Sequence, residues 1–155
     1  MNGGGIRGGR VYAPGTAISR RDVLAELPFG NRLVTLDLTG RALRQSLENG
    51  LSRLPDAAGR FPQVSGLAVE YDARRPAGDR IVSVRVGGAP LDPGRTYRVA
   101  TNDFLARGGD GYAAFAAVRP LLPVDDAPHL ANEVMVHLRR LGTVRSTVEG
   151  RLTAK

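Results

Sequence analysis

Short apolar segments of two kinds, separated by Gly and Pro, constrain the fold of this chain more than any other feature. Ile81–Val86 alternates Val with polar residues, as a half-buried strand does, and Arg32–Leu38 is similarly rich in Val, Leu and Thr. Arg41–Leu54 instead spaces its leucines three and four residues apart, which predicts an amphipathic helix. The two kinds of segment follow one another without regular βαβ alternation. We therefore expect an α+β fold with a mixed β-sheet and packed helices.

Capping residues and turn signals predict the remaining elements. Ser19 followed by Asp22 forms a capping box, which predicts a short helix over Arg20–Glu26. Residues 1–19 are too rich in Gly to form a helix or a regular strand. A last long helix is expected to begin at or near Asp126, with a buried stripe of Leu130, Val134, Leu138 and Leu141. The further expected elements are strands over Leu67–Tyr71, Tyr97–Thr101 and Thr147–Leu152 and a helical turn over Ala113–Val118.

Length and cysteine content restrict the class of protein. The chain has 155 residues, which suits one domain with one core. It contains no Cys, so disulfide frameworks, thiolate zinc sites and cysteine nucleophiles are excluded. No apolar run approaches the roughly 20 residues of a membrane-spanning helix, and no charged and apolar leader opens the chain. We expect a single globular domain with no membrane partner.

The formal net charge of +7 indicates an anionic partner without specifying it. Lys155 is the only lysine, so Arg supplies 21 of the 22 basic residues. Arg forms bidentate contacts with phosphate and carboxylate, although biased codon usage explains the same excess. The arginines are spread along the chain with no run longer than two, so a nucleic-acid-binding stripe is not indicated.

The Gly-rich start of the chain satisfies the pattern G-x-G-x-x-G with Gly3, Gly5 and Gly8. A dinucleotide-binding fingerprint needs a strand before these glycines and a helix directly after them, and this sequence has neither. No Lys lies near the glycines, which excludes a Walker loop. Two interpretations stay open. The backbone N–H groups bind an anion with help from Arg7 and Arg10, or the segment is a flexible, solvated arm.

No self-contained catalytic or metal-binding set is visible in the sequence. His129 and His137 are eight residues apart on the predicted last helix, too far for a shared metal ion, and there is no Cys to assist them. Asp125 and Asp126 suit the first turn of that helix without any catalytic role. No Ser-His-Asp pattern or G-x-S-x-G elbow occurs. We therefore assign no catalytic residue and no metal ligand.

Two phenylalanines lie in segments that are predicted to be loops. Phe29 stands between Pro28 and Gly30, and Phe104 precedes Asp110 in NDFLARGGDGY. Burial in the core is the ordinary role of Phe, yet two loop aromatics beside Gly-rich backbone can also clamp a flat ring. Asp110, between two glycines, can accept hydrogen bonds from the vicinal diol of a ribose or stabilise a tight turn. Composition leaves these alternatives open.

Longer phrases occur in a fixed order along the chain, namely NGGGIR at Asn2–Arg7, LPFGN at Leu27–Asn31, GRFPQVSG at Gly59–Gly66 and NDFLARGGDGY at Asn102–Tyr112. The phrases TGRAL, LDPGRTYRVAT and VEGRL accompany them. Together they resemble the C-terminal substrate-binding domain of the 5′-nucleotidase family, which includes UDP-sugar hydrolases and 2′,3′-cyclic-nucleotide phosphodiesterases. The resemblance covers residues 2–152. It implies the fold of that domain and a role in nucleotide catabolism.

The resemblance implies a nucleoside or nucleotide as the ligand and a role for seven residues. Phe29 and Phe104 match the two aromatics that sandwich the base. Asp110 matches the acid that binds the ribose hydroxyls, and Arg7 matches an arginine that contacts the phosphate. The remaining matches are Asn2 and Asn31, polar residues of the nucleoside pocket, and Gly59, a backbone position near the base.

The resemblance also implies a partner domain. Enzymes of the family carry an N-terminal metallophosphoesterase domain with two divalent metal ions, which activate water for phosphoester hydrolysis. Residues 1–155 contain no match to that domain, and a further phosphate-binding arginine, normally upstream of NGGGIR, is also missing. We therefore expect a fragment or a misassigned start at Met1, with the metal ions held outside this chain. A periplasmic or extracellular location follows only by analogy with the family.

Three hypotheses for the function follow, and we favour the first. The chain is a substrate-specificity domain that binds nucleosides or nucleotides without hydrolysing them. Alternatively, it is an RNA-binding module that uses the Gly/Arg-rich start and the positive charge, with an affinity that falls steeply with salt. In the third hypothesis it is a non-functional fragment that exposes the surface its partner domain would cover.

Overall fold

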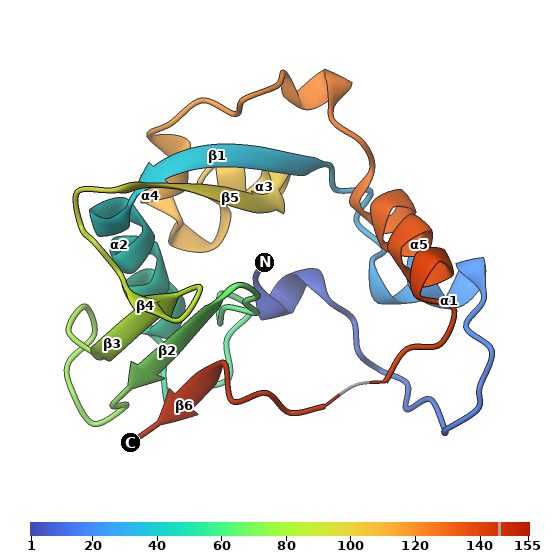
Figure 1. The fold of residues 1–155 in the computed structure, drawn as a ribbon, viewed down its shortest axis with the longest axis horizontal. Helices are drawn as coiled ribbons and strands as arrows, with labels where there is room; N and C mark the ends of the chain where they lie inside the picture. Colours follow the sequence, from blue (N-terminus) through green and yellow to red (C-terminus); the bar gives the residue numbers. More distant parts are fainter. Residues whose placement is uncertain (146) are drawn as a thin grey trace.

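Strands and helices follow one another in the irregular order expected from the sequence (Figure 1). The structure is a computed structural model that describes residues 1–145 and 147–155. Its strands are β1 (Leu33–Thr39), β2 (Leu67–Tyr71), β3 (Ile81–Val86), β4 (Ala89–Pro90), β5 (Thr96–Asn102) and β6 (Leu152–Ala154). Its α-helices are α1 (Arg20–Glu26), α2 (Gly40–Leu51), α3 (Asp103–Ala106), α4 (Ala113–Ala116) and α5 (Leu130–Leu141). The 3₁₀ turns are η1 (Gly3–Gly5), η2 (Gly109–Gly111) and η3 (Val124–Asp126).

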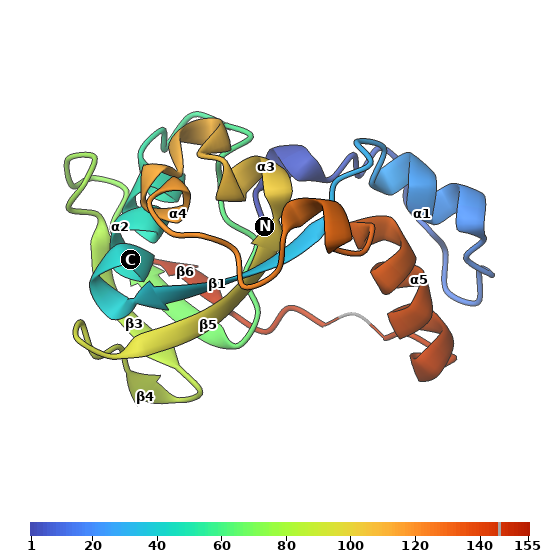
Figure 2. The ribbon, with the colours of Figure 1, turned by 90° about the horizontal axis from the view of Figure 1, so that it is seen from above.

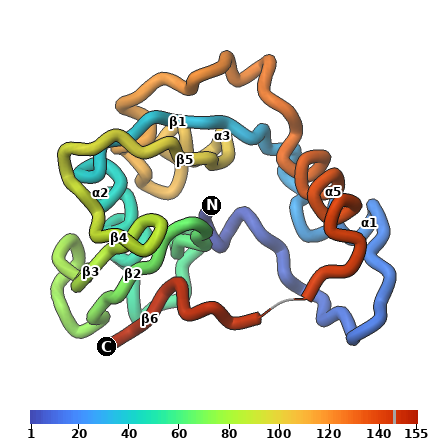
Figure 3. The backbone as a smooth tube through the Cα atoms, viewed as in Figure 1, coloured from blue at the N-terminus to red at the C-terminus, as the bar shows by residue number. Residues whose placement is uncertain are grey.

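The strands of the described residues form two separate sheets. β1 and β5 pair antiparallel over their full length, from Leu33 opposite Asn102 to Thr39 opposite Thr96. The second sheet has the order β4-β3-β2-β6, in which only β2 and β6 run parallel. Figure 3 shows β6, at the C-terminal end, beside β2 from the middle of the chain. The α+β prediction is confirmed, with the strands divided between two sheets.

The leucine stripe of α2 and the inner face of β1 each belong to one of the two larger clusters of the core. Leu43, Leu47 and Leu51 of α2 are buried against β2 and β3, as the spacing of the leucines predicts. The buried residues of β1 pack against the other part of the core, which includes Tyr112 and Phe115 around α4. These two clusters lie next to each other because β1 leads directly into α2.

α1 and α5 form a helix pair at one end of the molecule, beyond the end of the β1–β5 ribbon (Figures 1 and 2). Val23 of α1 packs there against Ala131 and Met135 of α5 in a small cluster of its own. The capping box predicted at the start of α1 is present, because the Ser19 hydroxyl and the Asp22 N–H are paired and the Asp22 carboxylate accepts from the Ser19 N–H.

The last helix begins later than predicted. Asp126 belongs to the turn η3, and α5 begins only at Leu130, after Pro128. A proline disfavours helical backbone in the residue before it, which explains the delay. The predicted buried stripe is confirmed in part, because Val134 and Leu138 pack against the cluster between α1 and α5. Ala131 and Met135 are the buried residues of α5, whereas Leu141 of the predicted stripe is 51% exposed.

Further differences concern the closing strand, the end of α2 and the Gly-rich start, while β1, β5 and α4 differ from their predicted bounds by one or two residues. The closing strand is β6 (Leu152–Ala154) and not Thr147–Leu152, because it pairs in parallel with Val69–Tyr71 and Val148 is fully exposed. α2 ends at Leu51 and not at Leu54. The Gly-rich start contains one regular turn, η1, in place of a wholly irregular segment.

Gly40, the first residue of α2, lies against the loop before β5. A Cβ at this position would lie 2.1 Å from the carbonyl oxygen of Asp92. We expect Gly40→Ala to lower the free energy of unfolding by about 1–3 kcal/mol, the usual cost of overpacking, even though Ala is the better helix former. Urea unfolding followed by circular dichroism measures the change. Arg41→Ala, at the exposed neighbouring position, is the control, and an equal loss of stability in both variants would contradict the prediction.

Candidate functional site

A cleft of about 540 Å³ opens between segments that are far apart in the sequence. They are the start of the chain, the loop before β1, the loop that follows α2, and the region of α3 and η2. All seven residues that the sequence predicts to bind the ligand line this cleft, although their roles stay predictions. The lining residues are Asn2, Gly4, Gly5, Arg7, Phe29, Asn31, Gly59, Asn102, Phe104, Arg107 and Asp110.

The two phenylalanines of the cleft come from segments that flank the β1–β5 ribbon. Phe29 precedes β1 and Phe104 follows β5, and the antiparallel pairing brings these two positions to the same end of the ribbon. Phe29 is 51% exposed and Phe104 is 43% exposed, so neither is a core residue. Phe29 lies in a loop as predicted, but Phe104 belongs to the short helix α3 and not to a loop. The Asn102 side chain caps that helix by accepting a hydrogen bond from the Leu105 N–H.

Asp103 ties the two phenylalanine-bearing segments together. Its Oδ1 accepts hydrogen bonds from the Asn31 Nδ2 and from the Arg32 N–H, both at 3.0 Å. Its own N–H donates to the carbonyl oxygen of Arg32, and its Oδ2 pairs with the guanidinium of Arg107. Burial of Asp103 opposes its ionisation, but the hydrogen bonds from Asn31 and Arg32 and the charge of Arg107 outweigh that effect and lower its pKa.

Three glycines, Gly4, Gly59 and Gly109, allow two close approaches that shape the cleft. A Cβ on Gly4 would lie 2.9 Å from the Cα of Gly59, so the two backbones meet without room for a side chain. A Cβ on Gly109 would lie 2.5 Å from ring atoms of Phe104, so the ring rests directly on the backbone of η2. The backbone of the cleft is therefore packed more tightly than larger residues would allow.

The first residues of the Gly-rich start, Gly3 and Gly4, form neither an anion-binding loop nor a free arm. The Gly3 N–H donates to Phe61 O and the Gly4 N–H donates to Gly59 O, each at 2.7 Å, so these donors are already used. Arg10 does not line the cleft either, because it pairs with Asp22 at 2.8 Å. Both interpretations that the sequence left open are thus wrong for the first residues of the chain, which pack against the loop after α2.

Asp110 adopts a backbone conformation that is unusual for a residue other than glycine. Its φ is 55° and its ψ is 20°, in the left-handed region, and such residues concentrate at functional sites. The Asn49 Nδ2 donates to its carbonyl oxygen (3.1 Å) and the Asn2 Nδ2 donates to its Oδ2 (2.6 Å). Tyr112 lies next to it, and burial together with the charge of Asp110 raises the pKa of the Tyr112 phenol, which donates to Arg60 O. The hydrogen bonds hold the carboxylate at the cleft in spite of the strain.

The two arginines of the cleft differ in their charge environment. Arg107 pairs with the carboxylate of Asp103. The guanidinium carbon of Arg7 lies 4.7 Å above the ring of Phe29 in a cation–π contact. None of the ion pairs among the described residues includes Arg7, so its positive charge is not compensated by a carboxylate. The cleft therefore has one neutralised and one uncompensated guanidinium.

The sequence predictions missed four lining residues, Gly4, Gly5, Asn102 and Arg107. All four lie inside the phrases NGGGIR and NDFLARGGDGY that carry the family resemblance. Asn102 carried a further signal, because a polar residue directly after a strand and before DFLA suits a helix N-cap. No sequence pattern indicates that Arg107 would face the cleft.

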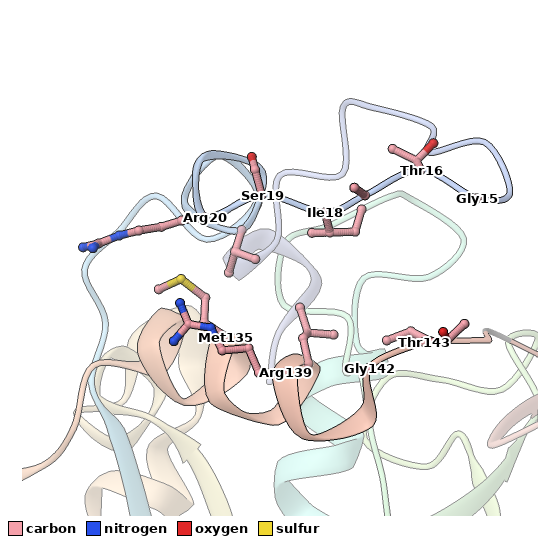
Figure 4. A pocket seen from close by; sticks show the side chains of 13 residues that line it. Gly15, Thr16, Ile18, Ser19, Arg20, Met135, Arg139, Gly142 and Thr143 are labelled. Carbon is pink, nitrogen blue, oxygen red and sulfur yellow. The ribbon is translucent and has the colours of Figure 1, made fainter.

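A second hollow, of about 420 Å³, lies between α5 and the segment that leads into α1 (Figure 4). Ile18 and Met135 face it, with Arg139 along its edge (Figure 4). None of its described lining residues is acidic or aromatic, so it lacks the carboxylate and the flat rings that converge in the first cleft. The cleft around Phe29 and Phe104 is therefore the candidate functional site.

The described residues contain neither a candidate metal cluster nor a candidate membrane-spanning helix. Within residues 1–145 and 147–155, no three His, Cys, Asp or Glu side chains lie together in a way that would hold a metal ion. His129 and His137 are both exposed, and His129 contacts the carbonyl oxygen of Gly30 (3.2 Å). In the same residues no helix has the length and apolar surface required to cross a bilayer.

Comparison with known proteins assigns the fold to a class of domain found within longer nucleotide-processing proteins. A family model described as "5′-nucleotidase, C-terminal domain" matches residues 1–117. The chain belongs to the 5′-nucleotidase C-terminal domain family. The prediction from the ordered sequence phrases is thereby confirmed at the level of the family.

Relatives and solved structures agree with this assignment. The 5′-nucleotidase precursor of Thermus thermophilus superposes with a TM-score of 0.88 and 41% identity over 99% of this chain and 30% of that one. The trifunctional nucleotide phosphoesterase protein YfkN of Bacillus subtilis is 36% identical over 97% of this chain and 10% of its own length. Human 5′-nucleotidase is 32% identical over 98% of this chain and 28% of its own length. The chain thus spans well under half of each of these relatives.

The contribution of the Asp103 charge to the stability of the fold can be tested. Because its pKa is lowered, the folded state is stabilised above the ordinary Asp pKa of 3.8 and loses that stabilisation as the pH falls through the lower folded value. We expect Asp103→Asn to lower the free energy of unfolding by about 1–3 kcal/mol at pH 7 and the difference from wild type to shrink below about pH 4.

Denaturant unfolding of wild type and Asp103→Asn at a series of pH values measures this difference. Asp37→Asn is the matched control, because Asp37 also has a lowered pKa but pairs with Arg98 on the surface. Such exposed pairs contribute about 1 kcal/mol or less. A difference for Asp103→Asn that did not depend on pH would contradict the role given to its charge.

Proposed function

We propose that the cleft binds a nucleoside or nucleotide. The base stacks between Phe29 and Phe104, the ribose hydroxyls donate to Asp110, and the phosphate pairs with Arg7. The observation that carries the proposal is that these four side chains, from three distant segments, line a single cleft. Their chemistry suits the ligand, since the cleft combines flat apolar rings with a hydrogen-bond acceptor and an uncompensated cation.

Each part of the ligand meets a group of matching chemistry in this proposal. Two half-exposed rings leave aromatic faces available for stacking, which any base tolerates. The Asn31 amide uses its Nδ2 on Asp103, so its Oδ1 remains as an acceptor for a base N–H. Asn2 lies beneath Asp110, and Gly59 offers backbone beside the pocket. The uncompensated charge of Arg7 suits a phosphate, for which guanidinium geometry is favourable.

We further propose that the chain is the substrate-recognition part of a longer 5′-nucleotidase-type hydrolase. Its relatives include proteins named as 5′-nucleotidases, and the chain matches only a part of each. A domain outside these residues, of the metallophosphoesterase type, would supply the metal ions and the hydrolytic step, because the described residues offer no cluster of ligands for a metal ion. Metal-dependent release of phosphate from AMP by the purified chain would contradict this division of labour.

Removal of the aromatic rings tests the base site. We expect Phe29→Ala and Phe104→Ala each to weaken binding of adenosine and of AMP by about 1–3 kcal/mol, because each removes one stacking surface. Isothermal titration of both ligands into the purified chain, without added metal, measures the loss. Leu122→Ala removes an exposed apolar side chain outside the cleft and should leave both affinities unchanged. Full affinity in both Phe variants would contradict the proposal.

Salt dependence separates this proposal from RNA binding. Adenosine carries no charge, so we expect its affinity to change little between low and high salt, whereas binding to a polyanion falls steeply as counterions are released. The packing of the Gly-rich start against Gly59 and Phe61 supports the pocket over a free basic arm. Titrations of adenosine and of a single-stranded RNA at several salt concentrations provide the comparison. Tight, salt-sensitive RNA binding without adenosine binding would favour the alternative.

A further inference from the structure

Two buried asparagines stand behind Asp110 in one line of hydrogen bonds. Asn102, 1% exposed, accepts from the Leu105 N–H with its Oδ1 at 2.8 Å. Its Nδ2 reaches the Oδ1 of Asn2 at the longer distance of 3.4 Å. Asn2, 3% exposed, donates from its Nδ2 to Asp110 Oδ2 at 2.6 Å. We call Asn102 and Asn2 the amide relay, which joins the start of α3 to the carboxylate in the cleft.

Each amide of the relay has only one orientation that satisfies its neighbours. A backbone N–H is solely a donor, so Asn102 presents its Oδ1 to Leu105 and its Nδ2 to Asn2. Asn2 must then present its Oδ1 to Asn102 and its Nδ2 to Asp110. An ionised carboxylate is solely an acceptor, so the last donor of the relay matches it. A reversed amide would set two acceptors against each other in a buried place, which is unfavourable.

The relay leaves one carboxylate oxygen available for a ligand. Asn2 occupies Asp110 Oδ2, and Asn49 binds only the backbone carbonyl of Asp110. No hydrogen bond among the described residues involves Asp110 Oδ1. Both polar atoms of the Asn2 side chain are engaged within the relay, so Asn2 acts on a ligand through Asp110. Asn2 thus holds the Asp110 carboxylate through Oδ2, and Oδ1 is available to accept a hydrogen bond from a ligand.

Gly5 gives the relay the room it occupies. A Cβ on Gly5 would lie 2.9 Å from Asn2 Oδ1 and 3.5 Å from Asn102 Nδ2, the two atoms that meet in the middle of the relay. Because a contact of 2.9 Å is shorter than a Cβ tolerates, a side chain here would push Asn2 away from Asn102. The amide relay can therefore be disturbed by a substitution at Gly5 as well as by one at Asn102.

We infer that Asn102 and Asn2 are positioning residues for ribose recognition, which make the chain select nucleosides that carry the vicinal diol. The inference rests on the proposed function, in which Asp110 binds the ribose hydroxyls. The relay aims the Asp110 carboxylate and prevents it from turning toward other donors. A ligand with two hydroxyl donors then meets an acceptor already in place, whereas a ligand without them gains nothing from it.

The test compares adenosine with 2′,3′-dideoxyadenosine, which lacks both hydroxyls. Because hydrogen bonds to a charged group are strong, we expect wild type to bind adenosine at least about 10-fold more tightly than dideoxyadenosine. Asn102→Asp keeps an oxygen for the Leu105 N–H but presents a second oxygen to Asn2, whose amide must then reverse and set its Oδ1 against Asp110. We expect the ratio of the two affinities to fall to about 2-fold or less, with the affinity for dideoxyadenosine unchanged.

Two further variants keep the test decisive. Gly5→Ala displaces Asn2 but keeps the Asn102 oxygen that caps α3, and it should reduce the ratio in the same way even if Asn102→Asp does not fold. Phe104→Leu is the matched control, since it should weaken both ligands equally and preserve the ratio. Isothermal titration gives the affinities, and thermal unfolding followed by circular dichroism shows which variants are folded.

The outcomes separate the inference from the proposed function. A wild-type ratio that survives in folded Asn102→Asp and Gly5→Ala overturns the relay and leaves the nucleoside site intact. If both affinities fall equally in these variants, Asn102 and Asn2 have only a structural role, and the inference is overturned as well. Equal wild-type affinities for the two ligands remove the ribose role of Asp110 and the inference with it. Absence of any wild-type binding overturns the proposed function itself.

Discussion

The antiparallel pairing of β1 with β5 is the interaction on which the candidate site depends. The pairing ends at Leu33 opposite Asn102, so the chain before β1 and the chain after β5 leave the ribbon at the same end. Phe29 lies in the segment before β1, and Phe104 lies in the segment after β5. Alternate residues of β1 are buried in the core, and a slip of one residue would turn all of them outward. The packing of the core therefore determines where the two rings of the cleft meet.

The cleft contains close backbone contacts and a strained residue, both of which usually lower the stability of a protein. Gly4 and Gly59 bring two backbones into contact, and Gly109 lies directly under the ring of Phe104. Asp110 holds a left-handed conformation that glycine would adopt with less strain. Hydrogen bonds from the side-chain amides of Asn2 and Asn49 offset part of that strain. Such a concentration of tight glycines, a strained acid and buried amides around one cavity is typical of a site kept for binding, since a region kept only for stability does not need them.

Local signals predicted most elements of the fold, whereas the candidate site was predicted through ordered phrases. The capping box at Ser19 and the leucine stripe of α2 depend on residues a few positions apart, and the structure confirms them. The start of α5 was predicted too early because it depends on Pro128. The loop position of Phe29 left burial in the core and a clamp on a flat ring both open, and its phrase then favoured a ligand. The burial of Asp103 was not predictable, because the fold alone brings distant donors to its carboxylate.

The carboxylate of Asp103 also makes the two sides of the cleft differ in charge. Asp103 neutralises Arg107 beside Phe104, so on this side of the cleft the carboxylate of Asp110 is the lining group that keeps its charge. Arg7, stacked on Phe29, retains its charge. In a site that excludes part of the water, an anion gains more from an uncompensated guanidinium than from one already paired with an acid. In the proposed function, a ligand with an uncharged ring and an anionic tail is therefore oriented with its tail toward Arg7.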